Sequence, residues 1–268
     1  MFTQELISLI GCALIASSLL SLWRSVSIKI VTGIGFISAL LLLLWFLSRW
    51  HYYLQAMGTN LFLSFPVATF YESVIFLVIL TLVVSGCIPR KFSSLKLTGA
   101  INMLCGAVLL SLNFFQNVSS PSLFLPSLRS YWLVAHVFLT FISYALFFIA
   151  ALLSTFSLFS PFPSQNEDFV KTIVTDGLII FTIGGLIFGA IWAENSWGRF
   201  WSWDPKETWA FITWICYSLL LHLVWAKKIT PKKFFMGNIA CFALVIFTYI
   251  GVNWFFGGLH SYGGISGD

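Results

Sequence analysis

The sequence predicts an all-α polytopic integral membrane protein, and three observations indicate that fold class. Of the 268 residues, 59% are hydrophobic and only 9% are charged, whereas about a quarter of the residues in an average soluble domain are charged. The mean hydropathy is +0.94. Apolar runs of about 20 residues, the length that a helix needs to cross about 30 Å of hydrocarbon, recur along the whole chain. We therefore expect a single membrane domain over residues 1–268, with no soluble domain of useful size.

About eight transmembrane helices are expected, because each apolar run ends at a charged or turn-rich break. The first run is interpreted as a retained span and not a signal peptide, since no basic residue precedes it and no small-residue cleavage site follows Trp23. The first four spans are expected at 6–23, 30–48, 68–86 and 95–115. Residues 119–126, rich in serine and proline, form the loop that follows them.

The second half of the chain holds four more expected spans, at 131–158, 175–193, 209–226 and 234–256. Residues 160–168 read as the loop between the first two of these. Gly184, Gly185 and Gly189 in the sixth span allow a neighbouring helix to approach closely. Asp204 is expected to cap the seventh helix, and Pro205 to begin it.

Lysine and arginine predict the orientation, because positively charged loops are retained on the inner side of a membrane. With the amino terminus outside, the inner loops hold ten of the 14 basic residues. The outer loops hold the other four, which are Arg49, Arg129, Arg199 and Lys206. Both termini, and a tryptophan-rich loop at residues 194–208, are therefore expected on the outer side, in a periplasm or lumen.

Two classes of function are disfavoured by the composition. The net charge of +5 could indicate a nucleic-acid partner, but the basic residues are scattered through short loops and form no aromatic-interleaved patch. The cysteines are isolated, form no C-x-x-C pair, and lie in or beside apolar runs, so we interpret them as packing residues and not as a disulfide framework or redox centre. They are Cys12, Cys87, Cys105, Cys216 and Cys241.

Tryptophan and charge meet in residues 193–209. An aromatic belt at the membrane interface accounts for isolated tryptophans, but poorly for Trp197, Trp201 and Trp203 clustered with Asp204 in one outer loop. Trp197 and Trp201 are four residues apart, so a helical turn lying on the membrane would place both on one face. A flat aromatic surface edged with charge suits a large, flat, partly polar ligand.

The histidines suggest what that ligand is. His136 lies near the outer start of the fifth span and His260 follows the last span on the same side. Two imidazoles that approach one plane from opposite sides fit a six-coordinate haem iron, whereas zinc lacks further ligands in local spacing. His222 lies within the seventh span toward the inner side, where an ionisable residue is a functional candidate. The alternatives are interfacial residues for the outer pair and a neutral, hydrogen-bonded imidazole for His222. His51 has no assigned role.

These residues resemble the tryptophan-rich WWD signature of haem-handling membrane proteins, and the wider context resembles the CcsA (ResC) family of System II cytochrome c biogenesis. The signature is Trp197-Gly198-x-x-Trp201-x-Trp203-Asp204-Pro205-Lys206-Glu207. Further matches are Trp132-Leu133-x-x-His136-Val137, Leu221-His222, Gly258-Leu259-His260-Ser261-Tyr262-Gly263 and Tyr71-Glu72-Ser73. One departure is Val224, where family members often carry an arginine two positions after the in-membrane histidine.

The resemblance implies a protein that carries haem b across or to the outer membrane face and presents it for covalent attachment to apocytochrome c at Cys-x-x-Cys-His. It implies that His136 and His260 are axial ligands of the haem iron and that His222 binds haem in transit. The implied wall of the site is Trp197, Trp201, Trp203 and Asp204. Arg199 and Lys206 are the outer cations available to the haem propionates.

The same resemblance implies a CcsB (ResB)-type membrane partner, so the chain would be the membrane component of a cytochrome c haem-lyase (synthase) complex. The implied location is a plastid thylakoid membrane, or otherwise a bacterial or cyanobacterial inner or thylakoid membrane. Three alternatives stay open: a haem exporter or chaperone without a role in ligation, a structural membrane subunit, and a transporter that uses His222 as a proton relay. No other intramembrane acid forms a plausible chain with His222, which disfavours the transporter.

Overall fold

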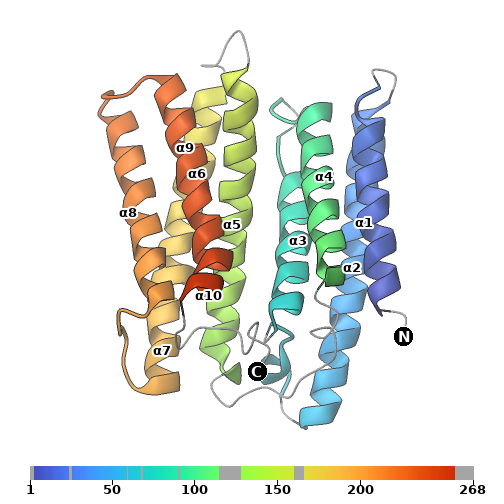
Figure 1. The fold of residues 1–268 in the computed structure, drawn as a ribbon, viewed down its shortest axis with the longest axis vertical. Coiled ribbons are helices and arrows are strands. Elements are labelled where there is room, and N and C mark those ends of the chain that lie inside the picture. Colours follow the sequence, from blue (N-terminus) through green and yellow to red (C-terminus); the bar gives the residue numbers. More distant parts are fainter. Residues whose placement is uncertain are drawn as a thin grey trace. The chain divides into compact units, whose positions relative to one another are not determined.

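The computed structural model of the chain describes residues 3–23, 26–58, 60–67, 69–89, 91–114, 128–159 and 166–256. Throughout these ranges the regular secondary structure is helical, without a strand (Figure 1). The predicted all-α fold class is therefore confirmed.

Each of the expected spans falls on one helical segment, and six of these segments are long and apolar enough to cross a membrane. The six are Ile28–Met57, Leu95–Phe114, Tyr131–Leu158, Glu167–Trp197, Pro205–Trp225 and Pro231–Phe255. Two shorter apolar helices, Gln4–Leu20 and Phe70–Gly86, cover the first and third expected spans. The protein is thus a polytopic membrane protein, while the total of eight spans and the outer location of both termini stay predictions.

By its internal contacts the chain divides into two compact units, Met1–Phe124 and Leu125–Asp268. Unit 1 contains α1 (Thr3–Leu20), α2 (Ile28–Met57), α3 (Phe70–Gly86) and α4 (Leu95–Ser111), with a short 3-10 helix, η1 (Phe62–Ser64), between α2 and α3. Within it, α1 packs on α4 and α2 packs on α3. Serine or threonine side chains accept backbone N–H groups at the starts of α2, α3 and α4, which satisfies donors that a helix start leaves unpaired. The single domain expected from the sequence stays a prediction.

One helix of unit 1 is longer than its apolar run. α2 continues to Met57, although the predicted span ends at residue 48. Arg49 therefore lies inside the helix, where only 8% of it is exposed, and its expected place in an outer loop is wrong. His51, one turn from the end of the apolar run, is exposed, and its Nε2 lies 2.9 Å from the side-chain amide of Gln55.

A buried asparagine connects three helices of unit 1. The Nδ2 of Asn102 in α4 donates to Ser17 Oγ of α1 at 2.8 Å and to the Val31 carbonyl of α2 at 3.0 Å. Asn102→Ala removes both of these buried hydrogen bonds, so we expect it to lower the free energy of unfolding by about 1–3 kcal/mol, measured by thermal denaturation of the purified protein. Leu104→Ala, on the exposed face of the same helix, is the control, and a loss as large as that of Asn102→Ala would contradict the assigned role.

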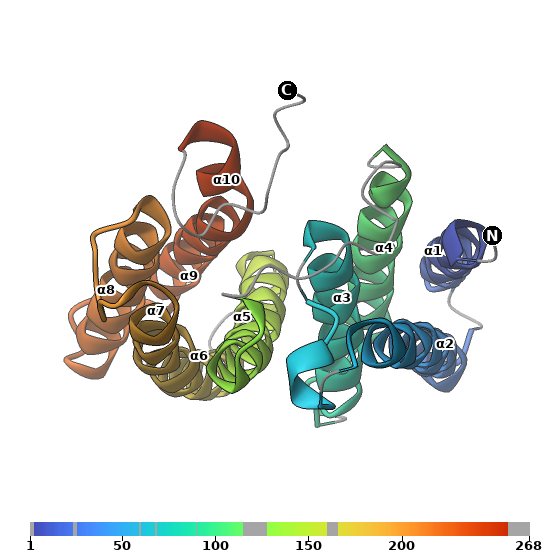
Figure 2. The ribbon, with the colours of Figure 1, turned by 90° about the horizontal axis from the view of Figure 1, so that it is seen from below.

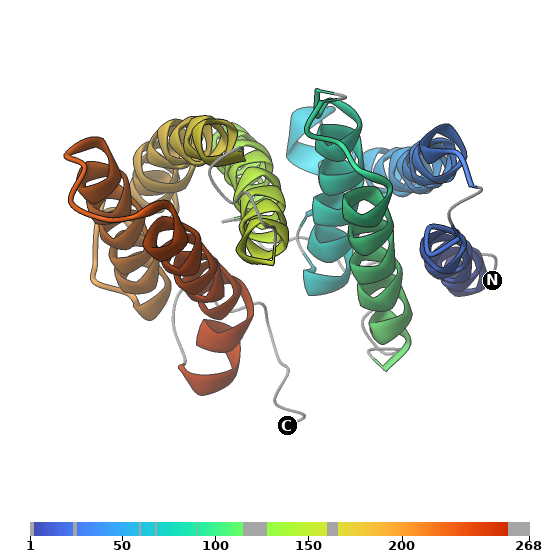
Figure 3. The ribbon, with the colours of Figure 1, turned by 90° about the horizontal axis from the view of Figure 1, so that it is seen from above.

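The described residues of unit 2, 128–159 and 166–256, form a bundle of four helical rods. The first rod, α5 (Tyr131–Leu158), packs against α6 and α9, and α8 (Pro205–Trp225) packs against the same two helices. Figures 2 and 3 show these rods of unit 2 from its two ends. Two of the rods contain a π-helix. They are α6–η5–α7 (Glu167–Phe181, Thr182–Phe188, Gly189–Trp197) and α9–η6–α10 (Pro231–Ile246, Phe247–Gly251, Val252–Phe255).

The antiparallel order of these rods gathers four helix termini at one end of unit 2. The starts of α5 and α8 and the ends of α7 and α10 lie together there (Figure 1). Both π-helices lie in the half of the unit next to this end, and π-helical turns are frequent at functional sites. This end carries the tryptophan-rich signature and is the end that the sequence predicts to face outward.

Candidate functional site

The loop of the signature begins at a glycine. α7 ends at Trp197, and Gly198 follows with a φ of 73° while its N–H donates to the Glu194 carbonyl at 2.9 Å. Glycine suits this left-handed conformation because it has no Cβ. Residues 198–204 are not helical. The expected helical turn that would place Trp197 and Trp201 on one face is therefore wrong.

Two buried carboxylates hold the other end of the loop. Asp204 accepts the backbone N–H of Lys206 at 2.9 Å, and Glu207 accepts the backbone N–H groups of Ser202 at 2.8 Å and of Asp204 at 3.2 Å. Asp204 and Glu207 are each 8% exposed. With Pro205 in the first turn, this is the capping arrangement that the sequence predicts. Both acids thus order the loop through its backbone.

Removal of the Glu207 carboxylate is expected to loosen this loop. Glu207→Ala leaves the amides of Ser202 and Asp204 without their acceptor, which should cost about 1–3 kcal/mol of local stability. Hydrogen exchange of the amides in residues 198–204 measures the effect, and we expect it to become about tenfold or more faster. Glu194→Ala removes a carboxylate from the same region and is the control. Equal exchange in the two variants would contradict the role of Glu207.

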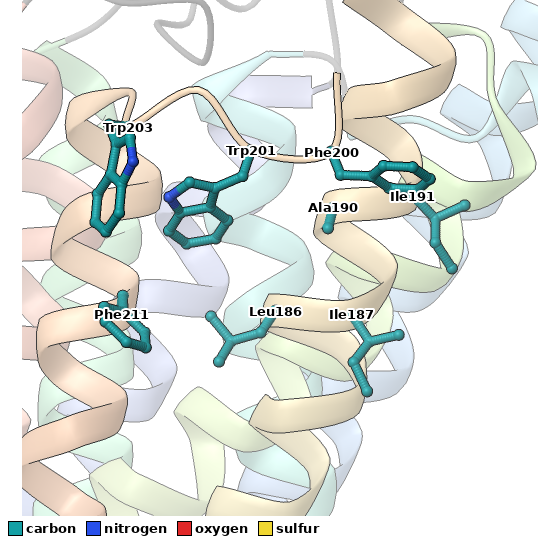
Figure 4. A pocket seen from close by; sticks show the side chains of 8 residues that line it. All are labelled: Leu186, Ile187, Ala190, Ile191, Phe200, Trp201, Trp203 and Phe211. Atoms are coloured by element: carbon teal, nitrogen blue, oxygen red, sulfur yellow. The ribbon is translucent and has the colours of Figure 1, made fainter. Parts of the chain in front are cut away.

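An apolar pocket of about 510 Å³ lies against the loop (Figure 4). Its walls come from the loop, from the start of α8, and from η5 and α7. The lining residues are Leu186, Ile187, Ala190, Ile191, Phe200, Trp201, Trp203 and Phe211. The Trp201 ring lies 5.8 Å from the Trp203 ring and 6.1 Å from the Phe211 ring, centroid to centroid, in edge-to-face contacts that aromatic rings prefer.

The backbone of Trp203 is strained. Its φ is 59°, a left-handed conformation that costs about 1–2 kcal/mol in a residue with a Cβ. The neighbouring bonds maintain it: Thr208 Oγ1 donates to the Trp203 carbonyl at 3.2 Å, and Glu207 binds the amides on both sides of Trp203. Strain of this kind concentrates at ligand sites, where it fixes the direction of a side chain. Here the fixed side chain is a pocket wall that is 66% exposed.

His136 lies in the second turn of α5, partly buried, with Nδ1 at 2.8 Å from the carbonyl oxygen of Gly184 in η5. Because a carbonyl oxygen only accepts, Nδ1 must donate. A neutral imidazole then carries its lone pair on Nε2, the form in which histidine binds a metal. A hydrogen bond from the second ring nitrogen to a carbonyl is also the arrangement that orients metal-binding histidines.

Two glycines let the α6–η5–α7 rod approach α5 closely around this histidine. A Cβ on Gly184 would lie 2.3 Å from Leu139 Cβ, and a Cβ on Gly189 would lie 3.0 Å from both Cε1 and Nδ1 of His136. The sequence predicts that a neighbouring helix approaches closely at these positions. This is confirmed, and the neighbouring helix is α5. Gly185 differs, because a Cβ there would meet a phenylalanine of its own rod.

Aromatic contacts link His136 to the signature. The His136 ring stacks on Trp192 with 5.9 Å between centroids and 16° between planes, and Trp192 contacts Trp197 at 4.9 Å. Sequence reasoning did not assign Trp192 to the site, although it is only 5% exposed. The available signal was its position three residues after Gly189, which places both on one face of a helix.

The signature is divided between two faces of the α6–η5–α7 rod. His136 meets Gly184, Gly189 and Trp192, whereas the pocket is lined by other residues of that rod together with Trp201 and Trp203. Trp197 therefore belongs to the row that leads to His136, and the other two tryptophans belong to the pocket. His136 itself does not line the pocket.

The other predicted haem contacts lie elsewhere. His222 is exposed in the last turn of α8, 17 residues after Pro205, which is about 26 Å along the helix. It thus lies at the opposite end of unit 2 from the loop.

The remaining predicted haem contacts are His260, Lys206 and Arg199. His260 lies outside the described residues. The Nζ of Lys206 donates to Asn253 Oδ1 at 3.0 Å, and Arg199 is exposed. Within the described ranges, no group of three or more His, Cys, Asp or Glu side chains is placed to hold a metal ion.

Comparison with known proteins extends over most of the chain. Residues 33–260 match the family model described as Cytochrome C assembly protein. Cytochrome c biogenesis protein CcsA of Chlamydomonas reinhardtii is 34% identical over 267 residues, covering 92% of this chain and 71% of that protein. The CcsA of Prochlorococcus marinus (strain MIT 9301) is 33% identical over 241 residues, covering 76% of this chain and 77% of that protein. A second Prochlorococcus marinus CcsA, of subsp. pastoris, is 31% identical over 288 residues, with 93% and 88% covered.

These relatives agree with the family resemblance and with an integral protein of a thylakoid or inner membrane. The chain belongs to the CcsA family of cytochrome c assembly proteins.

Proposed function

We propose that this chain acts in cytochrome c biogenesis by holding haem b at the outer end of unit 2 and presenting it for covalent attachment to apocytochrome c. The observation that carries the proposal is the state of His136. Its Nδ1 donates to the Gly184 carbonyl, its ring stacks on Trp192, and the lone pair of the neutral ring is on Nε2. These contacts support the assignment of His136 as an iron ligand at the end of the bundle that bears the WWD signature.

The chemistry of haem fits the two faces of this site. Haem is a large apolar ring with two anionic propionates, so it needs apolar cover together with cations or donors. The pocket of about 510 Å³ has the size of small-molecule sites, about 300–1,000 Å³, and we assign its aromatic wall, with Trp201 and Trp203, to apolar cover and not to ligation, since it lies on another face of the rod than His136. Iron ligation is assigned to His136 and His260, with Trp197 alongside. Arg199 is the exposed cation of the loop and is assigned to a propionate.

Release of the product requires an exchange of ligands. The histidine of the Cys-x-x-Cys-His segment must displace one protein ligand from the iron. His136 and His260 as neutral ligands permit this exchange, because a neutral imidazole binds iron less strongly than an anionic thiolate would. The two thiols that add to the haem vinyl groups come from apocytochrome c. His222, at the other end of α8, is assigned to haem in transit. A CcsB (ResB)-type membrane partner with an outer domain would complete the complex.

The visible spectrum of the chain, purified together with that partner, tests the proposal. We expect bound haem with two histidine ligands in the wild type. His260→Ala should lose the second outer ligand and change the spectrum at the iron, whereas His222→Ala should lower the amount of haem loaded and leave the spectrum of the remaining haem unchanged. A wild-type complex without haem absorbance would instead favour a structural subunit.

A second readout separates attachment from export. The amount of thioether-linked cytochrome c is measured in the same strains, beside the haem bound to the complex. A His136 variant that retains haem but forms no thioether product would favour participation in attachment. A variant that still forms product in proportion to the haem it binds would favour a haem exporter or chaperone.

A further inference from the structure

A buried ion pair joins α2 and α3 within unit 1, and the proposed function does not use it. Arg49 Nε lies 2.8 Å from Glu72 Oε1, and the Tyr53 hydroxyl donates to the same oxygen at 2.7 Å. Glu72 is 0% exposed and Arg49 is 8% exposed. Ionisable residues in membrane helices are costly to bury and mark functional sites by default.

Three polar atoms around this pair have no hydrogen-bond partner among the described residues. They are Glu72 Oε2, Trp45 Nε1 and the Tyr71 hydroxyl, all buried. The Trp45 ring contacts the Tyr71 ring at 6.0 Å between centroids, and the Arg49 guanidinium lies 5.8 Å above the Trp45 ring. The three side chains therefore adjoin one another or the ion pair.

The chemistry of these atoms specifies what can satisfy them. The indole N–H of Trp45 needs an acceptor and Glu72 Oε2 needs a donor, while the hydroxyl of Tyr71 can be either. A metal cation would suit the carboxylate but not the N–H group or the neighbouring guanidinium. An anion would suit the donors but not the carboxylate. Water accepts and donates, and buried waters typically pair with two to four otherwise unsatisfied polar groups.

We propose that Trp45, Tyr71 and Glu72 bind an internal water molecule beside the Arg49–Glu72 ion pair of unit 1. The bound water completes the hydrogen bonding of the carboxylate, whose other oxygen is occupied by Arg49 and Tyr53. It thereby keeps a charged glutamate tolerable inside a membrane protein, where lipid supplies no hydrogen bonds. The site is a hydrated polar centre that holds α2 against α3.

Radiolytic hydroxyl labelling of the intact chain, purified with its partner, tests this site. Hydroxyl radicals made from a bound water label the side chains next to it even where bulk solvent is excluded. After correction for the intrinsic reactivity of each residue type, we expect Trp45 and Tyr71 to be labelled at least about fivefold faster than Phe46, an equally buried neighbour on α2. Labelling of Trp45 and Tyr71 no faster than that of Phe46 would overturn the proposal.

A pair of matched variants identifies the water as the cause. Tyr71→Phe removes one partner of the water and should reduce labelling of Trp45 severalfold, whereas Tyr52→Phe, on the exposed side of α2, should leave it unchanged. Retained labelling of Trp45 in Tyr71→Phe would show that the water is not shared between these two side chains. A melting transition that stays above the labelling temperature in each variant confirms that labelling reports on a folded protein.

Discussion

His136→Ala is expected to reduce haem bound at the outer end of unit 2 by about tenfold or more while the chain still inserts and folds. His136 is the proposed iron ligand, and its Nδ1 donates to the Gly184 carbonyl; even partners that only orient a metal ligand are worth about 10–100-fold in affinity. The measurement is the haem absorbance per mole of this chain, purified with the proposed partner, with thioether-linked cytochrome c as the second readout. Thioether product should fall by a larger factor than bound haem, because the proposal gives His136 a part in attachment as well as in holding haem.

His51→Ala is the matched control for this variant. His51 is also a histidine in a membrane helix, but it is exposed and pairs with Gln55, so its removal should leave haem content unchanged. Trp192→Leu is a graded test, because it removes the ring that stacks on His136 and leaves the imidazole in place. A His136→Ala protein with full haem content and an unaltered spectrum would reject His136 as a ligand.

Gly184→Ala is expected to destabilise unit 2 and also to weaken the haem site. The added Cβ would lie 2.3 Å from Leu139 Cβ and 3.0 Å from the Thr140 backbone nitrogen, and neither can move without shifting α5. Overpacking of this kind costs about 1–3 kcal/mol. Since the carbonyl of Gly184 also accepts from His136, displacement of η5 from α5 should lengthen that bond and change the visible spectrum.

Gly33→Ala distinguishes this effect from a general response to alanine. Gly33 lies in the membrane-spanning α2, and a Cβ there would meet nothing within 4 Å. It should raise stability slightly, by about 0.5–1 kcal/mol, because alanine is the better helix residue. Thermal denaturation and the haem spectrum are recorded for both variants. Equal melting temperatures would contradict the close packing of η5 on α5.

The fold was largely predictable because lipid leaves a chain few options. A backbone in hydrocarbon must satisfy its own hydrogen bonds, so long apolar runs indicate helices directly. The ends of the helices were less predictable. α2 continues to Met57 because polar residues can extend a helix beyond the hydrocarbon. An apolar run in the sequence marks only the part of the helix that lies in the hydrocarbon, and not its full length.

Local features of the site were predictable, whereas the side-chain partners between rods were not. The cap at Asp204 depends on a few consecutive residues and is confirmed. The helical turn after Trp197 was wrong because Gly198 takes the left-handed conformation that ends a helix. The stacking of Trp192 on His136 depends on how two rods pack. The spacing of residues along one segment does not determine that packing. For the same reason, the Arg49–Glu72 pair, 23 residues apart, was missed.

The hydrogen bond between Lys206 and Asn253 ties the first turn of α8 to α10. Asn253 precedes His260, the second proposed ligand, by seven residues in the sequence. Capture of haem by one imidazole and approach of the other would then be linked movements. Lys206 would link the two segments through this bond, and Arg199 would be the cation that pairs with a haem propionate.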